Sequence, residues 1–169
     1  MPANIPSDNE LSLLAVRVGA SLLTRNLRIA LAESCTGGYV AKLITDVPGS
    51  SRWFNSGVVA YSNEAKQKQL GVTAASLAQH GAVSEQVAVE MAVGALVMGE
   101  AQRAVGITGV AGPDGGTQAH PVGLVWFSRT QRLENGSVGA FAMQRRFNGD
   151  RDEVRRQAAA FAMGMLLDP

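Results

Sequence analysis

The chain has 169 residues, 46% of them hydrophobic and 17% charged, with a formal net charge of +1. This composition indicates one globular domain with a buried core, and the absence of a basic tract excludes an electrostatic nucleic-acid-binding surface. A single cysteine excludes an internal disulfide framework, and two histidines far apart, without carboxylates at ligand spacing, argue against a zinc site. With no secretory signal and no apolar stretch long enough to span a bilayer, we expect a cytoplasmic protein with no membrane partner.

Hydrophobic spacing along the chain predicts helices that alternate with strands. Helices are expected over about residues 9–26, from Tyr39 to before Pro48, from Ser62 or Asn63 to Gly71, and over about 74–79, 85–99 and 150–166, the last capped by Asn148. Strands are expected over about 28–33, 56–61, 103–108, 122–129 and 137–146, and Asn135-Gly136 indicates that the last two form an antiparallel hairpin. This order predicts an α/β fold: a single three-layer α/β/α domain over residues 1–169, with a mixed sheet of about five strands and a flexible segment 1–8.

The first strand is expected to end in a turn that carries possible nucleophiles. Glu33-Ser34-Cys35-Thr36-Gly37-Gly38 follows the apolar run 29–32, and a helical pattern begins at Tyr39. Backbone N–H groups point outward at a helix N-terminus, where the helix dipole is positive, so an anion or a developing oxyanion is favoured there. An ordinary tight turn of small residues is the plain alternative.

Two more polar loops are expected to follow the second and third strands. Tyr61 to Lys66 offers two proton-transfer groups, and the glycines between Thr108 and Thr117 could expose backbone N–H groups to an anion. That glycine loop is neither a P-loop nor a dinucleotide-binding motif, and a long connection is an equal alternative. If the first three strands are parallel, all three loops meet at one edge of the sheet. This arrangement suggests a serine hydrolase that uses lysine as its base.

The base and the nucleophile each have a competing interpretation. Lys66 could lie on an exposed helix face; as a base, its pKa must fall from about 10.4 to near 7, which corresponds to about 4 kcal/mol and requires burial. Lys68 cannot point the same way, because residues two apart on a helix face different directions. Cys35 could be the nucleophile, but cysteine hydrolases usually use a histidine partner, which is not evident here. We therefore expect Ser34 to attack and Cys35 to pack.

Several motifs in order closely resemble the CinA C-terminal domain family over about residues 10–165. They are Ala32 to Gly38, Pro48-Gly49-Ser50-Ser51, Tyr61 to Lys66, Gly81-Ala82-Val83-Ser84-Glu85, Thr108 to Thr117, and Gly149-Asp150-Arg151. The resemblance is to the stand-alone form rather than to the longer proteins with an added N-terminal domain. One departure is visible: His120 stands before Pro-Val-Gly where the family commonly has lysine, which could weaken phosphate binding or make it pH-dependent.

The resemblance implies hydrolysis of nicotinamide mononucleotide (NMN) to nicotinate mononucleotide and ammonia in pyridine nucleotide salvage, without metal or cofactor, by a homo-oligomer. Ser34 would be the nucleophile and Lys66 the general base, with Tyr61 assisting. Thr36, Gly37 and Gly38 would frame the oxyanion and ring. The residues implied in substrate binding are Glu33, Thr36, Gly37, Gly38, Ser51, Ser62, Asn63, Thr108, Gly109, Ala111, Gly112, Gly115, Gly116 and Arg151, with the phosphate against Ser51, Thr108, the 112–116 loop or Arg151. A non-catalytic nucleotide-binding or interaction domain, and an amidase of another small carboxamide, are the alternatives.

Overall fold

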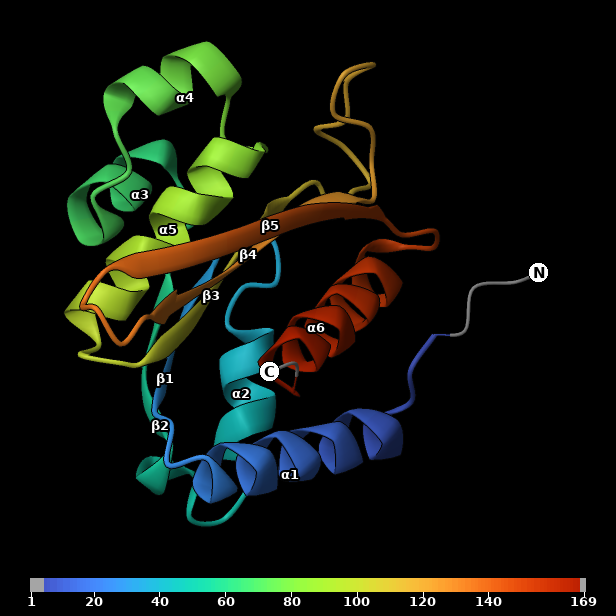
Figure 1. Ribbon diagram of the computed structural model, residues 1–169. Helices are drawn as coiled ribbons and strands as arrows, with labels where there is room; N and C mark the ends of the chain where they lie inside the picture. The colour runs from blue at the N-terminus through green and yellow to red at the C-terminus, as the bar shows by residue number, and fades with distance from the viewer. Residues whose placement is uncertain (1–4, 168–169) are drawn as a thin grey trace.

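The structure, a computed structural model, describes residues 5–167 as helices packed on a five-stranded sheet (Figure 1). The predicted order of elements is confirmed, with ends shifted by a few residues at most. The helices are α1 (Asp8–Thr24), α2 (Tyr39–Thr45), α3 (Asn63–Leu70), α4 (Ala74–His80), α5 (Glu85–Met98) and α6 (Arg151–Leu167). The strands are β1 (Ile29–Glu33), β2 (Phe54–Val59), β3 (Arg103–Gly109), β4 (Leu124–Arg132) and β5 (Val138–Arg146), and a 3-10 turn, η1 (Ser50–Arg52), precedes β2.

The strand directions place three loops at one edge of the sheet. The strand order is β2-β1-β3-β4-β5, in which β1 pairs in parallel with both β2 and β3. Strand β4 is antiparallel to β3 and to β5, so the predicted hairpin is confirmed. Because β1, β2 and β3 run the same way, the loops that follow them gather at the same edge.

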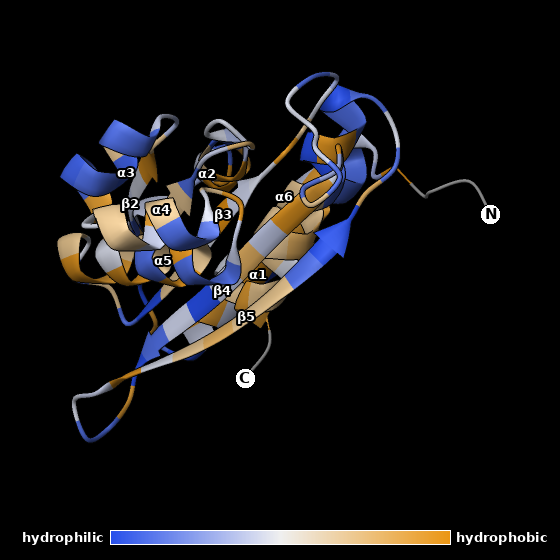
Figure 2. Cartoon of the chain, turned by 90° about the horizontal axis from the view of Figure 1, so that it is seen from above, coloured by the Kyte–Doolittle hydropathy of each residue, from blue (hydrophilic) through white to orange (hydrophobic). Residues whose placement is uncertain are grey.

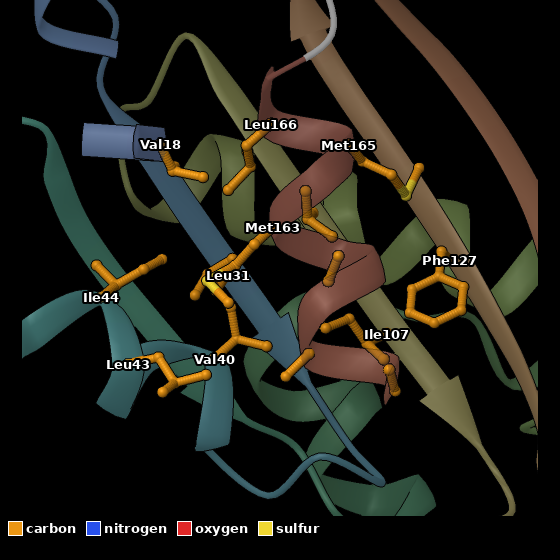
Figure 3. Packing of buried hydrophobic residues seen from close by; sticks show 14 of the residues in the cluster. Val18, Leu31, Val40, Leu43, Ile44, Ile107, Phe127, Met163, Met165 and Leu166 are labelled. Atoms are coloured by element: carbon orange, nitrogen blue, oxygen red, sulfur yellow. The ribbon is translucent and has the colours of Figure 1, made fainter. Parts of the chain in front are cut away.

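The helices cover the two faces of the sheet in three layers, as predicted. Side chains alternate along β1, so that Ile29 and Leu31 join the core under α1, α2 and α6, whereas Ala30 and Ala32 join the core under α3 and α5. Figure 3 shows Met163 and Leu166 of α6 over the sheet with Leu31 and Ile107. None of the helices described over residues 5–167 has the length and apolar character needed to cross a membrane.

The cap of α6 and the start of α1 differ from the prediction. Helix α6 is capped by Asp150, not by Asn148: the Glu153 N–H donates to Asp150 Oδ1 (2.9 Å) and the Asp150 N–H donates to Glu153 Oε2 (2.8 Å). This reciprocal pair satisfies two helix-end donors at once, which a cap farther upstream could not. Of the segment expected to be flexible, residues 1–4 lie outside the described residues. Ser7 caps α1, and Asp8 forms an ion pair with Arg156 (2.6 Å).

Helix α5 approaches α3 so closely that only glycine fits at the contact. A Cβ atom at Gly94 would lie 2.0 Å from the Leu70 carbonyl oxygen at the end of α3. At Gly164 of α6, by contrast, a Cβ atom would meet nothing within 4 Å. The position of α3 against α5 therefore depends on the missing side chain at Gly94.

We expect Gly94→Ala to lower the free energy of unfolding by about 1–3 kcal/mol, because the overpacked methyl group forces α3 away from α5. Gly164→Ala is the matched control and should raise it by about 1 kcal/mol through helix propensity alone. Urea denaturation followed by circular dichroism measures both. Equal stability of the two variants would show that α3 and α5 are not in close contact.

Candidate active site

The three loops at the carboxyl edge of the parallel strands enclose a cavity of about 260 Å³, here called the catalytic cavity. Its walls come from the loops after β1, β2 and β3, from α3, from the segment before α5, and from the first residue of α6. The residues that line it are Ser34, Cys35, Tyr61, Asn63, Lys66, Ala82, Val83, Thr108, Gly109, Val110, Ala111, Gly112, Asp114, Gly115 and Arg151. The prediction that the loops meet is thus confirmed.

Ser34 and Lys66 are in direct contact inside this cavity. Lys66 Nζ lies 2.9 Å from Ser34 Oγ, although the two residues are 32 positions apart. Helix α3 is mostly hydrophilic (Figure 2), yet the Lys66 side chain is only 1% exposed. Lys68, two residues on, points to solvent and pairs with Glu64 instead (2.6 Å). The choice between a buried and an exposed Lys66 is settled in favour of burial.

The burial of Lys66 makes its charged form less favourable than in water. Its Nζ also donates to the carbonyl oxygens of Ala60 (2.9 Å) and Tyr61 (3.1 Å), and no carboxylate pairs with it among residues 5–167. Burial lowers the pKa of the Lys66 amine, because the ammonium form loses its hydration. In the structure Nζ is also placed to donate to Ser34 Oγ, and once the amine is neutral its two N–H groups can stay on the two carbonyls while its lone pair accepts from the Ser34 hydroxyl. That is the arrangement a general base needs.

Cys35, by contrast, is held in its protonated thiol form. Burial raises the pKa of the Cys35 thiol to about 12, and the N–H groups of Cys35 and Thr36 only partly offset this effect. The thiolate is the nucleophilic form of cysteine, so at neutral pH this side chain is unreactive. The geometry and the electrostatics both favour Ser34 as the nucleophile.

Glu33 overturns the expectation that the N-terminus of α2 binds an oxyanion. Its buried carboxylate accepts hydrogen bonds from the N–H groups of Gly38 (3.0 Å), Val40 (3.2 Å) and Ala41 (2.8 Å). The Gly37 N–H is also used, since it donates to the Ser34 carbonyl (2.9 Å). The donors of this helix end therefore hold the turn in place and are not directed at a ligand.

Tyr61 and Arg151 form a bridge at the rim of the cavity. The Tyr61 side chain is 60% exposed, and its hydroxyl accepts a hydrogen bond from Arg151 Nη2 (2.8 Å). Arg151 Nη1 donates to the Gly112 carbonyl (2.7 Å) in the loop after β3. Tyr61 touches Lys66 through its backbone carbonyl, so the expected help of its hydroxyl in proton transfer is not seen in the contacts.

The structure separates the predicted binding residues into two groups. Asn63, Thr108, Gly109, Ala111, Gly112, Gly115 and Arg151 line the catalytic cavity, whereas Glu33, Thr36, Gly37, Gly38, Ser51, Ser62 and Gly116 do not. Ser62 caps α3 through the Ala65 N–H (3.0 Å). Ser51 belongs to η1, which precedes β2, so it lies at the opposite edge of the sheet from the catalytic cavity.

Three residues of the cavity wall were missed in the sequence, namely Ala82, Val83 and Val110, whereas Asp114 belongs to the predicted 112–116 loop. Ala82 and Val83 lie in the Gly81–Glu85 motif, which carried the resemblance but was given no role. The Thr108 hydroxyl donates to the Ala82 carbonyl (2.7 Å), and this hydrogen bond holds the segment with Ala82 and Val83 against the end of β3 at the cavity. His120 does not line the cavity; its N–H donates to Thr117 Oγ1 (3.0 Å) within the loop. Within residues 5–167, no three His, Cys, Asp or Glu residues gather as a metal ion would require.

Comparison with known proteins shows the family of this chain. The model of the family described as CinA C-terminal domain matches residues 11–169. The chain belongs to the CinA C-terminal domain family.

Two curated relatives of this CinA-family chain are named nicotinamide-nucleotide amidohydrolase PncC. The protein from Escherichia coli (strain K12) is 52% identical over 160 residues, covering 95% of this chain and 94% of that protein. The protein from Pseudomonas putida is 47% identical over 157 residues, covering 93% and 95%. The crystal structure of competence/damage inducible protein CihA from Agrobacterium tumefaciens superposes with a TM-score of 0.86 at 39% identity, covering 98% and 97%. The predicted family and fold are confirmed.

The buried Lys66 of this CinA-family domain should make its stability depend on pH. In the unfolded chain a lysine titrates near about 10.4, and burial lowers that pKa in the fold. Between the two values the unfolded chain binds more protons, so the free energy of unfolding rises with pH. We expect the wild type to gain stability relative to Lys66→Met as the pH increases from about 7 to about 10.

Urea denaturation of both proteins across this range measures the difference, since other titrating groups cancel in the comparison. Lys68→Met, which removes an exposed lysine from the same helix, is the control. Parallel curves of stability against pH for the wild type and Lys66→Met would contradict the lowered pKa.

Proposed function

We propose that this protein hydrolyses the carboxamide of NMN to nicotinate mononucleotide and ammonia, with Ser34 as nucleophile and Lys66 as general base. The observation that carries the proposal is the 2.9 Å contact between Ser34 Oγ and a buried Lys66 Nζ that has no carboxylate partner among the described residues. Two relatives about half identical to this chain carry the name of an enzyme with this activity. Both supports point to an amidohydrolase.

The proposed reaction begins with proton transfer from the Ser34 hydroxyl to neutral Lys66. Ser34 Oγ bonds to the carboxamide carbon, and the carbonyl becomes a tetrahedral oxyanion. The ammonium formed at Lys66 gives a proton to the leaving nitrogen, the C–N bond breaks, and ammonia departs. Water then attacks the acyl-enzyme: Lys66 takes its proton and returns it to Ser34 Oγ as the acid is released.

Charge stabilisation in this scheme comes from Lys66 itself. At the moment the oxyanion forms, the new ammonium lies about 3 Å from the attacking oxygen, in a site where burial strengthens the interaction. The carbonyl oxygens of Ala60 and Tyr61 hold the ammonium there through two hydrogen bonds. The same group thus serves as base, as electrostatic partner and as acid.

The other end of the substrate is proposed to lie near Arg151. Arg151 is the cation in the lining of the catalytic cavity besides Lys66, and its two hydrogen bonds use two of the five guanidinium donors. The remaining donors suit a phosphate group, for which arginine is well matched. The carboxamide is then directed at Ser34, and the reaction places the protein in pyridine nucleotide salvage.

Purified protein incubated with NMN should release ammonia and nicotinate mononucleotide. Ser34→Ala should lower kcat by at least about 10³-fold, because the acyl-enzyme cannot form. Cys35→Ala is the matched control and should keep most of the turnover, since the thiol is protonated and packed. Inactivity of Cys35→Ala together with retained activity of Ser34→Ala would assign the nucleophile to the other residue.

The role of Lys66 as general base is tested by comparing two lysines of α3, Lys66 and Lys68. Lys66→Ala should lower kcat by about 10²- to 10⁴-fold through loss of proton transfer, whereas Lys68→Ala should leave it unchanged. If folded wild-type protein binds NMN without forming product, the non-catalytic alternative holds. If it releases ammonia from another small carboxamide in preference to NMN, the substrate assignment is wrong.

A further inference from the structure

A second hollow lies directly beside the catalytic cavity. This outer cavity has a volume of about 600 Å³ and is lined by Pro113, Val122 and residues 149–152, which lead into α6. Ala111 and Arg151 line both hollows, so these two residues stand between them. The two spaces are neighbours with a shared wall.

The wall is held closed by hydrogen bonds from three segments of the chain. The Arg151 guanidinium, on α6, reaches the Gly112 carbonyl in the loop after β3 and the Tyr61 hydroxyl after β2, at 2.7 and 2.8 Å. A guanidinium is planar and rigid, so two bonds in different directions fix its plane. The bridge therefore lies in the wall that the two hollows share.

We propose that the Tyr61–Arg151–Gly112 bridge determines the size of the substrate: it admits a mononucleotide and excludes a dinucleotide that carries the same carboxamide. The inference rests on the proposed function, in which the carboxamide reaches Ser34 and the phosphate lies at Arg151. A dinucleotide bound in the same way extends beyond Arg151, on the side of the outer cavity. Arg151 is thus a specificity-determining residue as well as a phosphate ligand.

The charge of the outer cavity adds to the exclusion. Asp150 and Asp152, the sequence neighbours of Arg151, line it. Asp150 also accepts a hydrogen bond from the Glu153 N–H, and Asp152 lies 3.9 Å from Arg156. The second phosphate of a dinucleotide would approach these two carboxylates, and repulsion between like charges is a common way to reject a competing ligand. The mononucleotide has no second phosphate to bring into the outer cavity. The bridge and the acidic lining therefore both favour the mononucleotide over the dinucleotide.

The test compares the ratio of kcat/KM for NMN to kcat/KM for the oxidised nicotinamide adenine dinucleotide. In the wild type this ratio should be about 100 or more, and Arg151→Ala should lower it by at least about tenfold, because the two cavities merge. Arg146→Ala on β5, an exposed arginine that lines neither cavity, is the matched control and should leave the ratio unchanged. A ratio rather than a rate is used because Arg151→Ala also weakens NMN turnover.

A binding measurement covers the case in which Arg151→Ala is too slow to assay. In a Ser34→Ala background, calorimetry gives dissociation constants for both nucleotides with and without Arg151→Ala. Loss of NMN affinity with retained or improved dinucleotide affinity supports the wall. An equal loss for both ligands, or an unchanged kcat/KM ratio, overturns it and leaves Arg151 as a phosphate ligand alone.

The outcome also separates this inference from the proposed function. A wild type that hydrolyses both nucleotides equally well retains the function and refutes the wall. A wild type that hydrolyses neither refutes the function, and the binding measurement still decides whether the bridge discriminates between the two ligands.

Discussion

The buried amine of Lys66 is the constraint on which the rest of the site depends. An ammonium in this position loses hydration and has no carboxylate partner among the described residues, so burial lowers the pKa of the Lys66 amine. That burial requires α3 to be packed tightly enough to exclude water. The close contact between Gly94 of α5 and Leu70 at the end of α3 holds the helix that carries Lys66 against the domain.

Glu33, the residue before Ser34, carries a buried carboxylate. A carboxylate directly beside Ser34 could have paired with the lysine and kept it charged. Its two oxygens are instead used by three N–H groups of α2, so the negative charge stabilises the turn. The turn and the base are thereby supported by separate sets of hydrogen bonds.

Sequence patterns predicted the fold well where local chemistry decides the structure. Asn135-Gly136 specified the hairpin, and the apolar runs bounded by small or polar residues specified the strands. The pairing of Ser34 with Lys66 followed from the parallel strand ends and from the family resemblance. What the sequence could not show was the destination of each polar group: that Glu33 would take the N–H groups of α2, that Ser51 would lie at the other edge, and that Asp150 would replace Asn148 as a cap. Those outcomes depend on which groups meet in three dimensions.

The mixed sheet also divides the molecule into a part that carries chemistry and a part that does not. Among the described residues, none that lines the catalytic cavity comes from β4 or β5. Because β4 runs antiparallel to β3, the turn at 133–137 lies at the edge of the sheet away from the three loops. That turn is therefore a suitable place for a fluorophore, an affinity tag or surface immobilisation, since a group attached at Asn135 projects from the end of the molecule remote from Ser34.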